Sequence, residues 1–281
     1  MRSATAVATW AIVAVLAGGA PVHAQHRFAI RFRGSPGAAF TYVLQQTTRT
    51  TFDNGEVLGV WQRMWVSEVV EGDSGGATSV AFSVDSLQVG TPASPRGLSD
   101  QQLAIMREFK GHLRFNSRME VVRAGVAGWE RMPADLGPLV TDAVLGMFPT
   151  LPPSRVAPGD SWTTRIKVPG VLLPGVGTPL LATVRLRLVD VEIAGADTLA
   201  RIGVRIMLPQ EPFEEIRGGE RATFQPEGSL AGGYVVSLPS GLVRTGQLHG
   251  QLRVTITFQS SGARGSFVID HHSSLRLVRS R

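Results

Sequence analysis

The sequence predicts a mainly β fold: a large curved antiparallel sheet, or half-barrel, with two short helices packed on one face. Long segments alternate apolar and polar residues with the period of two that a half-buried strand requires. Turns rich in Gly, Asn and Pro separate these segments at short intervals. Long strands joined by short turns are typical of an antiparallel meander.

The N-terminal third contains four predicted strands. Asp53-Asn54-Gly55 and Gly72 to Gly76 are predicted turns between them, because Asn and Gly tolerate the positive φ of tight hairpins. Trp61 and Trp65 share one face of the third strand, and both of its faces are apolar enough for partial burial. The four strand segments are 28–33, 39–52, 57–70 and 77–89.

Two helices are predicted after a Pro- and Gly-rich loop at Thr91 to Gly97. Residues 99–110 begin with Ser99 as N-cap and Gln102 completing a capping box. Residues 133–147 have Pro133 in the first turn, and Leu139 and Val144 belong to a stripe near 3.6 spacing. Shorter strands at 113–122 and 125–129 separate the two helices.

The C-terminal half is predicted to consist of strands and turns, with residues 209–227 as a longer loop. The segment from Val168 to Leu180 is apolar yet interrupted by three prolines and three glycines, so it is irregular. Its leucines, Leu172 and Leu173, either cover the core as a lid or contact a ligand or membrane. The predicted strands are 161–168, 180–193, 198–208, 229–238, 242–258 and 266–279.

Residues 1–24 have the layout of a secretory signal peptide. Arg2 precedes a short apolar run, and Val22-His23-Ala24 matches a small-residue cleavage site. We therefore expect cleavage between Ala24 and Gln25 and an exported protein, periplasmic or extracellular. Residues 25–281 contain no second apolar run of 18 residues, so we predict one β-rich domain without a transmembrane segment.

The composition excludes several kinds of chemistry. The sequence has no cysteine, which excludes thiolate catalysis, disulfides and Cys-based metal sites. Of the 28 basic residues, all but Lys110 and Lys167 are arginines. Many arginines alternate with apolar residues in predicted strands, as in Arg185-Leu186-Arg187. This arrangement predicts a basic sheet face, either solvated or in contact with an anionic partner, and no nucleic-acid partner.

Gly72-Asp73-Ser74-Gly75-Gly76 resembles the segment around the nucleophilic serine of chymotrypsin-like proteases, which would make Ser74 a nucleophile. That family places its histidine and aspartate far upstream. Here only His23 and His26 precede Ser74, and the expected histidine motif is missing. We therefore interpret the segment as a hairpin turn and predict no catalytic residue.

Asp270-His271-His272 lies in the last predicted strand. His271 shares a face with Ile269 and Leu275, whereas Asp270 and His272 share the other face. Two of these side chains can supply metal ligands, but zinc needs three or four, and no spacing unites them with the other histidines. We interpret them as solvent-facing polar residues and predict neither a metal nor a cofactor.

The stretch Leu151-Pro152-Pro153…Pro158-Gly159-Asp160-Ser161-Trp162 resembles one in uncharacterised secreted β-rich bacterial proteins. Locally, we expect Pro158-Gly159 to form a turn, Asp160 to accept backbone N–H groups and Trp162 to anchor the next strand. More remotely, a half-barrel with helices is similar to the periplasmic lipoprotein carriers, which hold acyl chains between sheet and helices. This resemblance implies an apolar cavity and no particular activity.

We therefore expect an exported, non-enzymatic cell-envelope protein that binds an apolar or amphipathic ligand, such as a lipid. One alternative is a structural or interaction module that presents its arginine face to an anionic surface. A hydrolase using Ser74 or residues 270–272 is the third hypothesis. The predicted ligand-binding residues are Trp61, Trp65, Leu139, Val144, Leu172 and Leu173.

Overall fold

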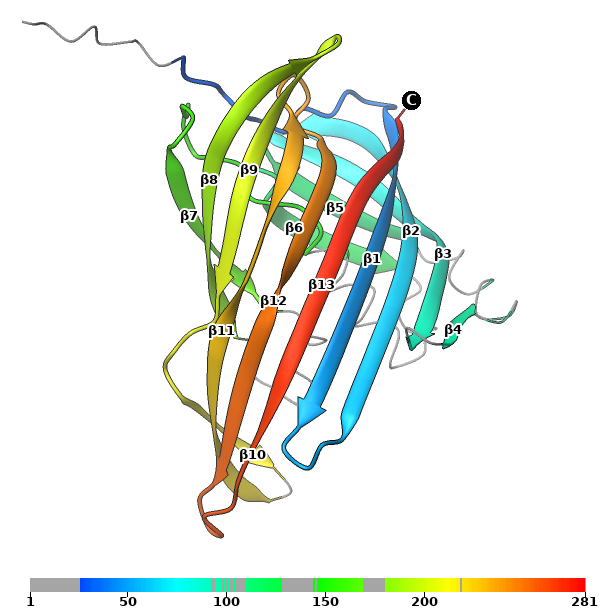
Figure 1. Cartoon of the computed structure of the whole chain (residues 1–281). Helices are drawn as coiled ribbons and strands as arrows, with labels where there is room; N and C mark the ends of the chain where they lie inside the picture. The colour runs from blue at the N-terminus through cyan, green and yellow to red at the C-terminus, as the bar shows by residue number, and fades with distance from the viewer. Residues whose placement is uncertain are drawn as a thin grey trace, which may run out of the picture.

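The computed structural model describes residues 26–91, 94–97, 99, 101, 104, 110–127, 144, 146–168, 180–217 and 219–280. These residues form one 13-stranded sheet in which neighbouring strands are antiparallel (Figure 1). The strands are β1 (Ala39–Phe52), β2 (Val57–Ser74), β3 (Ala77–Thr91), β4 (Ser94–Gly97), β5 (Lys110–Asn116), β6 (Val121–Ala127), β7 (Ser161–Lys167), β8 (Leu181–Ala194), β9 (Asp197–Met207), β10 (Phe213–Arg217), β11 (Glu220–Ser237), β12 (Val243–Phe258) and β13 (Arg264–Ser280).

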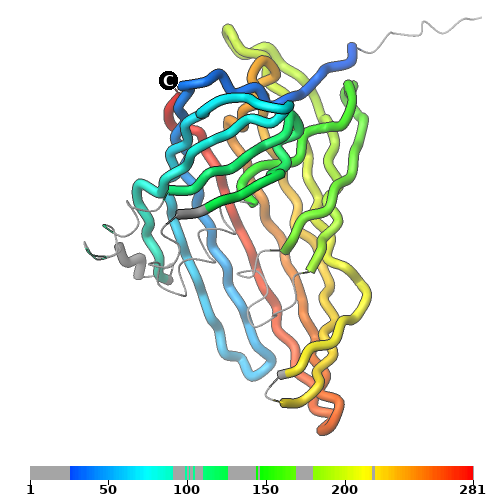
Figure 2. The backbone as a smooth tube through the Cα atoms, turned by 180° about the vertical axis from the view of Figure 1, so that it is seen from behind, coloured from blue at the N-terminus to red at the C-terminus, as the bar shows by residue number. Residues whose placement is uncertain are grey.

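The sheet consists of two meanders, β1–β6 and β7–β13, which are joined by the first and the last strand of the chain. The strand order is β6-β5-β3-β2-β1-β13-β12-β11-β9-β8-β7, with β4 paired to β3 and β10 paired to β11. The two meanders meet where β1 pairs with β13. Within the described residues the sheet is open, because its edge strands β6 and β7 do not pair with each other. Figure 2 shows β5, β6 and β7 on the same side of the central strands.

Alternating burial along the strands defines an inner face of the sheet, which carries the core. In β1 the even-numbered residues from Phe40 to Thr50 point to this face, and most of them are buried. From Tyr42 to Thr50, their partners in β13 are odd-numbered residues such as Ile269 and Leu275. The buried apolar side chains form two clusters, a larger one around Tyr42 and Leu186 and a smaller one around Phe224.

The Pro-Gly-Asp-Ser-Trp stretch has the local structure that the sequence predicts. Gly159 has a φ of +98°, and the Asp160 N–H donates to the Ala157 carbonyl at 3.0 Å, closing a turn. The Asp160 carboxylate accepts the Ala157 N–H at 3.0 Å and the Arg27 guanidinium at 2.7 Å. Trp162 is buried, and its indole N–H donates to the Thr150 carbonyl at 2.8 Å.

Several secondary-structure assignments from the sequence are wrong, among them one strand and two loops. Residues 28–33 form a single bridge, Phe28 to Val156, instead of a strand, and the Phe32 and Arg33 N–H groups donate to two other segments, at Ser117 and Ser240. The predicted loop 209–227 contains β10 and the start of β11, which pair as a hairpin and stack Phe213 on Phe224. The predicted loop Thr91 to Gly97 contains β4, which pairs with β3.

The prediction of two helices on one face is not supported within the described residues. Most of 99–110 and 133–147 lies outside them. Gln101, Ala104 and Val144 have helical backbone, but Lys110 already begins β5 and Met147 lies in a bend. A nearly all-β fold built on one antiparallel sheet is the part of the predicted fold class that the structure confirms.

Glycines allow β11 and β12 to approach closely. A Cβ on Gly232 would lie 1.9 Å from the Gln247 carbonyl oxygen, far inside van der Waals contact. A Cβ on Gly246 would lie 2.5 Å from the ring of Tyr234, which covers this bare position. Any side chain at Gly232 would therefore force the two strand backbones apart.

We predict that Gly232→Ala destabilises the protein by about 1–3 kcal/mol, because the methyl group must displace the β12 backbone. Gly203→Ala in the neighbouring β9 is the matched control, since its closest new contact is an ordinary 3.4 Å to Val189. Thermal unfolding followed by circular dichroism should give a clearly lower midpoint for Gly232→Ala alone. Equal midpoints for the two variants would contradict the close-approach argument.

Candidate functional site

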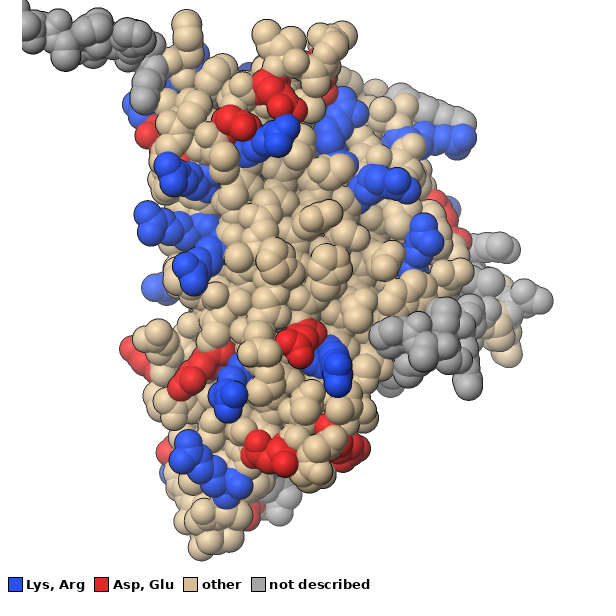
Figure 3. All heavy atoms as spheres, viewed as in Figure 1, with Lys and Arg blue, Asp and Glu red and all other residues tan. Residues whose placement is uncertain are grey.

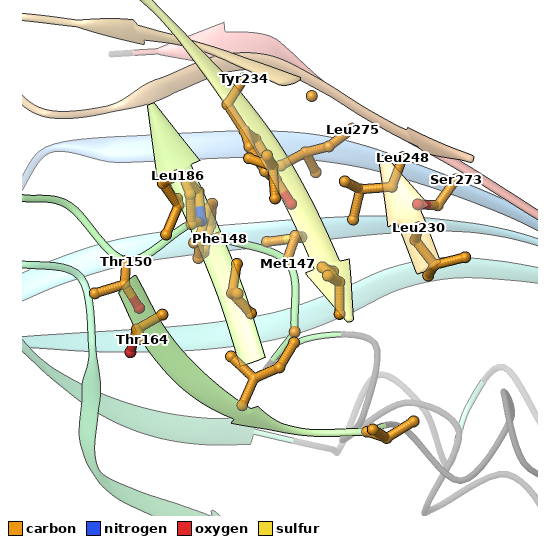
Figure 4. Close-up of a pocket in the computed structure, with 18 of the residues that line it drawn as sticks. Met147, Phe148, Thr150, Thr164, Leu186, Leu230, Tyr234, Leu248, Ser273 and Leu275 are labelled. Carbon is orange, nitrogen blue, oxygen red and sulfur yellow. The ribbon is translucent and has the colours of Figure 1, made fainter. Parts of the chain in front are cut away.

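The inner face holds a cavity of about 580 Å³ where the two apolar clusters meet. Both meanders contribute to its wall, and Figure 4 shows Leu186, Leu230, Leu248 and Leu275 around it together with Met147 and Phe148. Its volume lies in the range of roughly 300–1,000 Å³ that is usual for small-molecule sites. The apolar lining consists of Leu44, Met119, Val121, Met147, Phe148, Ile166, Val168, Val184, Leu186, Val204, Ile206, Leu208, Leu230, Leu248, Leu252 and Leu275.

A row of polar side chains interrupts this apolar wall on β1 and β13. The strand register pairs Gln46 with Ser273 and Thr48 with His271, which places all four on the inner face. Gln46, His271 and Ser273 line the cavity. Thr48 Oγ1 lies 3.0 Å from His271 Nδ1, and Gln62 of β2 donates from its amide nitrogen to Gln46 Oε1. The row forms a polar floor within an apolar cavity.

His271 is uncharged at neutral pH in the folded protein. Desolvation by burial, with a smaller contribution from the neighbouring His272, lowers the pKa of His271 to about 4. Its ring is therefore a neutral hydrogen-bonding group. The polar floor carries no formal charge as a result.

The charged groups in the cavity lining do not belong to β1 or β13, the strands of this floor. Arg165 and Lys167 belong to the edge strand β7, which four strands separate from β13 in the sheet. Both residues are exposed, whereas His271 and Ser273 are buried. Glu120 lines the cavity next to β6 and forms an ion pair with Arg118 at 3.2 Å. The charges are thus near solvent and the neutral polar groups are inside.

Glu68 is a second buried polar group on the inner face, outside the cavity lining. Burial raises the pKa of Glu68 to about 8 and raises the pKa of the neighbouring Tyr42 well above its usual value. Among the described residues, Glu68 Oε1 and the Tyr42 hydroxyl have no hydrogen-bond partner. Since Glu68 does not line the cavity, its shifted pKa does not serve chemistry there.

The chemistry that short motifs suggest is not assembled in the described residues. Ser74 ends β2 in a hairpin, and its hydroxyl accepts a hydrogen bond from Arg114 at 3.1 Å. In this part of the chain no group of three or more His, Asp or Glu side chains is arranged to hold a metal ion. No helix among the described residues has the length and apolar character needed to span a membrane.

Comparisons with known proteins reveal similarity in fold only. No protein-family model matches the sequence, and no curated protein matches it. The chain is similar in fold to lipovitellin, in a solved structure concerned with lipid–protein interactions. The TM-score is 0.52, the identity is 13%, and the match covers 89% of this chain and 26% of the lipovitellin chain. The chain thus spans about a quarter of lipovitellin's length. A second match is DynF from the dynemicin biosynthesis pathway of Micromonospora chersina, with 11% identity over 97% of this chain and 92% of DynF. Its TM-score of 0.25 is too low to support an argument.

The ligand-binding residues predicted from the sequence do not line the cavity where the structure describes them. Trp61 and Trp65 are half-buried on the opposite face of β2, where the Arg63 guanidinium lies 4.6 Å from the Trp65 ring centre. Val144 is buried in the larger apolar cluster. Leu139, Leu172 and Leu173 lie outside the described residues. The two tryptophans lie away from the cavity because the alternate residues Met64 and Val66 occupy the inner face.

Sequence reasoning assigned His271 to solvent, whereas the structure buries it in the cavity floor. The face assignment was correct: His271 does point with Ile269 and Leu275, and Asp270 and His272 are exposed. The signal available in the sequence was this sharing of a face with apolar residues. Gln46 and Thr48 gave no comparable signal, since they acquire their role only through pairing with β13.

We predict that His271 makes the folded state less stable as the pH falls from about 6.5 to about 4. Over that interval the unfolded chain takes up a proton that the folded protein does not, which favours unfolding by up to about 3 kcal/mol. Chemical denaturation at pH 7, 5.5 and 4 should therefore show a loss in the wild type that is smaller in His271→Gln. His272→Gln is the control because His272 is exposed. Parallel pH profiles for the wild type and His271→Gln would contradict the buried, neutral state.

Proposed function

We propose that this protein is an exported, non-enzymatic cell-envelope protein that binds an apolar or amphipathic ligand, such as a lipid, in the cavity of its inner face. The observation that carries this proposal is the cavity of about 580 Å³ with a mainly aliphatic wall. Such a wall favours apolar ligands, because each buried Å² of apolar surface contributes roughly 25 cal/mol. The similarity in fold to lipovitellin, studied for its lipid–protein interactions, supports a lipid as the ligand.

A binding role is favoured over catalysis by the position of the reactive groups. Ser74 lies in a surface hairpin and Glu68 lies in the core, and neither contacts the cavity. The histidine in the cavity forms its hydrogen bond with Thr48. Export is proposed from the signal-peptide layout of residues 1–24.

We predict that the purified protein binds a fluorescent fatty-acid or lipid probe and that Leu248→Trp weakens this binding at least about tenfold, equal to about 1.4 kcal/mol. Leu248 lines the cavity, so the larger side chain takes up ligand space. A titration that follows probe fluorescence measures the affinity, and thermal unfolding reports whether each variant is folded.

Leu181→Trp is the matched control for this experiment. Leu181 is exposed on β8 and is not part of the cavity lining, so the same substitution should leave probe affinity unchanged. Absence of probe binding to the wild type would overturn the proposed function. Equal weakening by both variants would remove the cavity as the binding site.

A second candidate function is attachment to an anionic lipid surface, and a cluster of unpaired arginines favours it. Arg185, Arg187 and Arg205 lie exposed on the outer face of β8 and β9, and Arg185 is directly opposite Arg205. None of the three takes part in an ion pair among the described residues. Figure 3 shows basic side chains along this edge of the sheet. Like charges directly opposite each other destabilise a strand pair, unless an anion screens them.

We predict that the protein binds vesicles of phosphatidylglycerol better than vesicles of phosphatidylcholine, and that Arg185→Ala/Arg187→Ala weakens this binding about 30-fold. The estimate takes about 1 kcal/mol for each basic residue near an anionic surface. Arg49→Ala/Arg253→Ala removes the same charge from β1 and β12 and should have a smaller effect. Sedimentation with vesicles at low and high salt provides the measurement. Equal losses in both double variants would indicate a response to net charge alone.

A further inference from the structure

We propose that the polar floor of the cavity recognises an uncharged hydrogen-bond acceptor, such as an ester carbonyl, carried by an otherwise apolar ligand. This inference rests on the proposed ligand binding and defines the ligand class further. It starts from three side chains, Gln46, His271 and Ser273, that line the cavity between aliphatic neighbours. Buried polar groups on an apolar wall are costly unless they have partners, so a ligand group that pairs with them gains affinity.

The register between β1 and β13 gathers these side chains into one site. Gln46 lies opposite Ser273, and Thr48 lies opposite His271, on the same face. On the far side of β13, Gly250 of β12 lies opposite His271. His271 thus has Thr48 opposite it in β1 and Gly250 opposite it in β12. Because Gly250 has no side chain, only Thr48 places a side chain beside the His271 ring from these two paired positions.

The existing hydrogen bonds leave donors available on this floor. Gln46 Oε1 accepts from Gln62, so the amide N–H groups of Gln46 are not used in that bond. In the proposed tautomer the Thr48 hydroxyl donates to His271 Nδ1 across 3.0 Å, and His271 Nε2 carries the ring proton. The Ser273 hydroxyl adds a further donor. The floor thus offers two or three neutral N–H or O–H groups to one acceptor.

The absence of charge on these three side chains favours a carbonyl over a carboxylate. An ionised carboxylate placed here would lose water without gaining a cation from the floor, since Arg165 and Lys167 are exposed residues of the edge strand β7. A carbonyl oxygen loses far less hydration and accepts the same hydrogen bonds. An ester or ketone attached to an alkyl chain therefore suits both the floor and the aliphatic wall.

Competition against the bound fluorescent probe tests this inference. The competitors are n-dodecane, methyl laurate and laurate, which share their chain length and differ in the polar group. We expect methyl laurate to displace the probe about five- to tenfold more effectively than dodecane, as one or two hydrogen bonds allow. We also expect it to exceed laurate at pH 8, where laurate is ionised.

Matched pairs of variants locate the effect. Gln46→Leu and His271→Leu should abolish the advantage of the ester over the alkane while dodecane still displaces the probe. Gln45→Leu and His272→Leu, one residue away and on the outer face, should retain the advantage. Thr48→Val, which removes the hydroxyl that orients His271, should reduce it, and Ser273→Ala provides a milder change if a leucine variant does not fold.

The outcomes separate this inference from the proposed function. Equal displacement by methyl laurate and dodecane would overturn carbonyl recognition and leave the apolar cavity intact. Stronger displacement by laurate that depends on His271 would make the floor an anion site and would also overturn the inference. Failure of the probe and of every competitor to bind would instead overturn the proposed function.

Discussion

The pairing of β1 with β13 is the interaction on which the rest of this structure depends. It joins strands that are more than 200 residues apart in sequence and unites two meanders into a single sheet. Each meander alone has an apolar inner face, and together they form the two clusters that enclose the cavity. The same register places Thr48 beside His271 and Gln46 beside Ser273. A slip of one residue would turn these side chains to the outer face, so the site and the fold share one constraint.

The cavity is a departure from the dense packing that protein interiors normally have. Its wall consists of aliphatic side chains from both clusters, which lose favourable contacts where no atom faces them. A ligand that fills the space restores those contacts and stabilises the folded state by mass action. Gly232 permits the close approach of β11 and β12 that forms one wall, while Tyr234 covers the bare backbone at Gly246. The backbone geometry of β11 and β12 therefore affects the space that the cavity offers to a ligand.

The electrostatic properties of the two faces differ, and burial is the cause. On the inner face, desolvation keeps His271 neutral, so polar groups act there as hydrogen-bonding partners. On the outer face, the arginines of β8 and β9 are exposed to water, and Arg63 packs against Trp65. A ligand inside is selected by shape and hydrogen bonding, whereas a partner outside is attracted by charge. At the β7 edge of the sheet, charged side chains border the cavity, because Arg165 and Lys167 belong to its lining.

The sequence by itself determined the mainly β class, most strand positions and the faces of individual strands, because the period of two is a local property. It also predicted the turn at Gly159 and the burial of Trp162. It did not identify β10, whose hairpin with β11 lies in a stretch rich in Glu and Gly, and it did not show which face of β2 is the inner one, because both faces are apolar. The tertiary structure alone decided the β1–β13 partnership and hence the cavity floor. Strand pairing over such a distance depends on the packing of the whole sheet, which no local pattern of residues encodes.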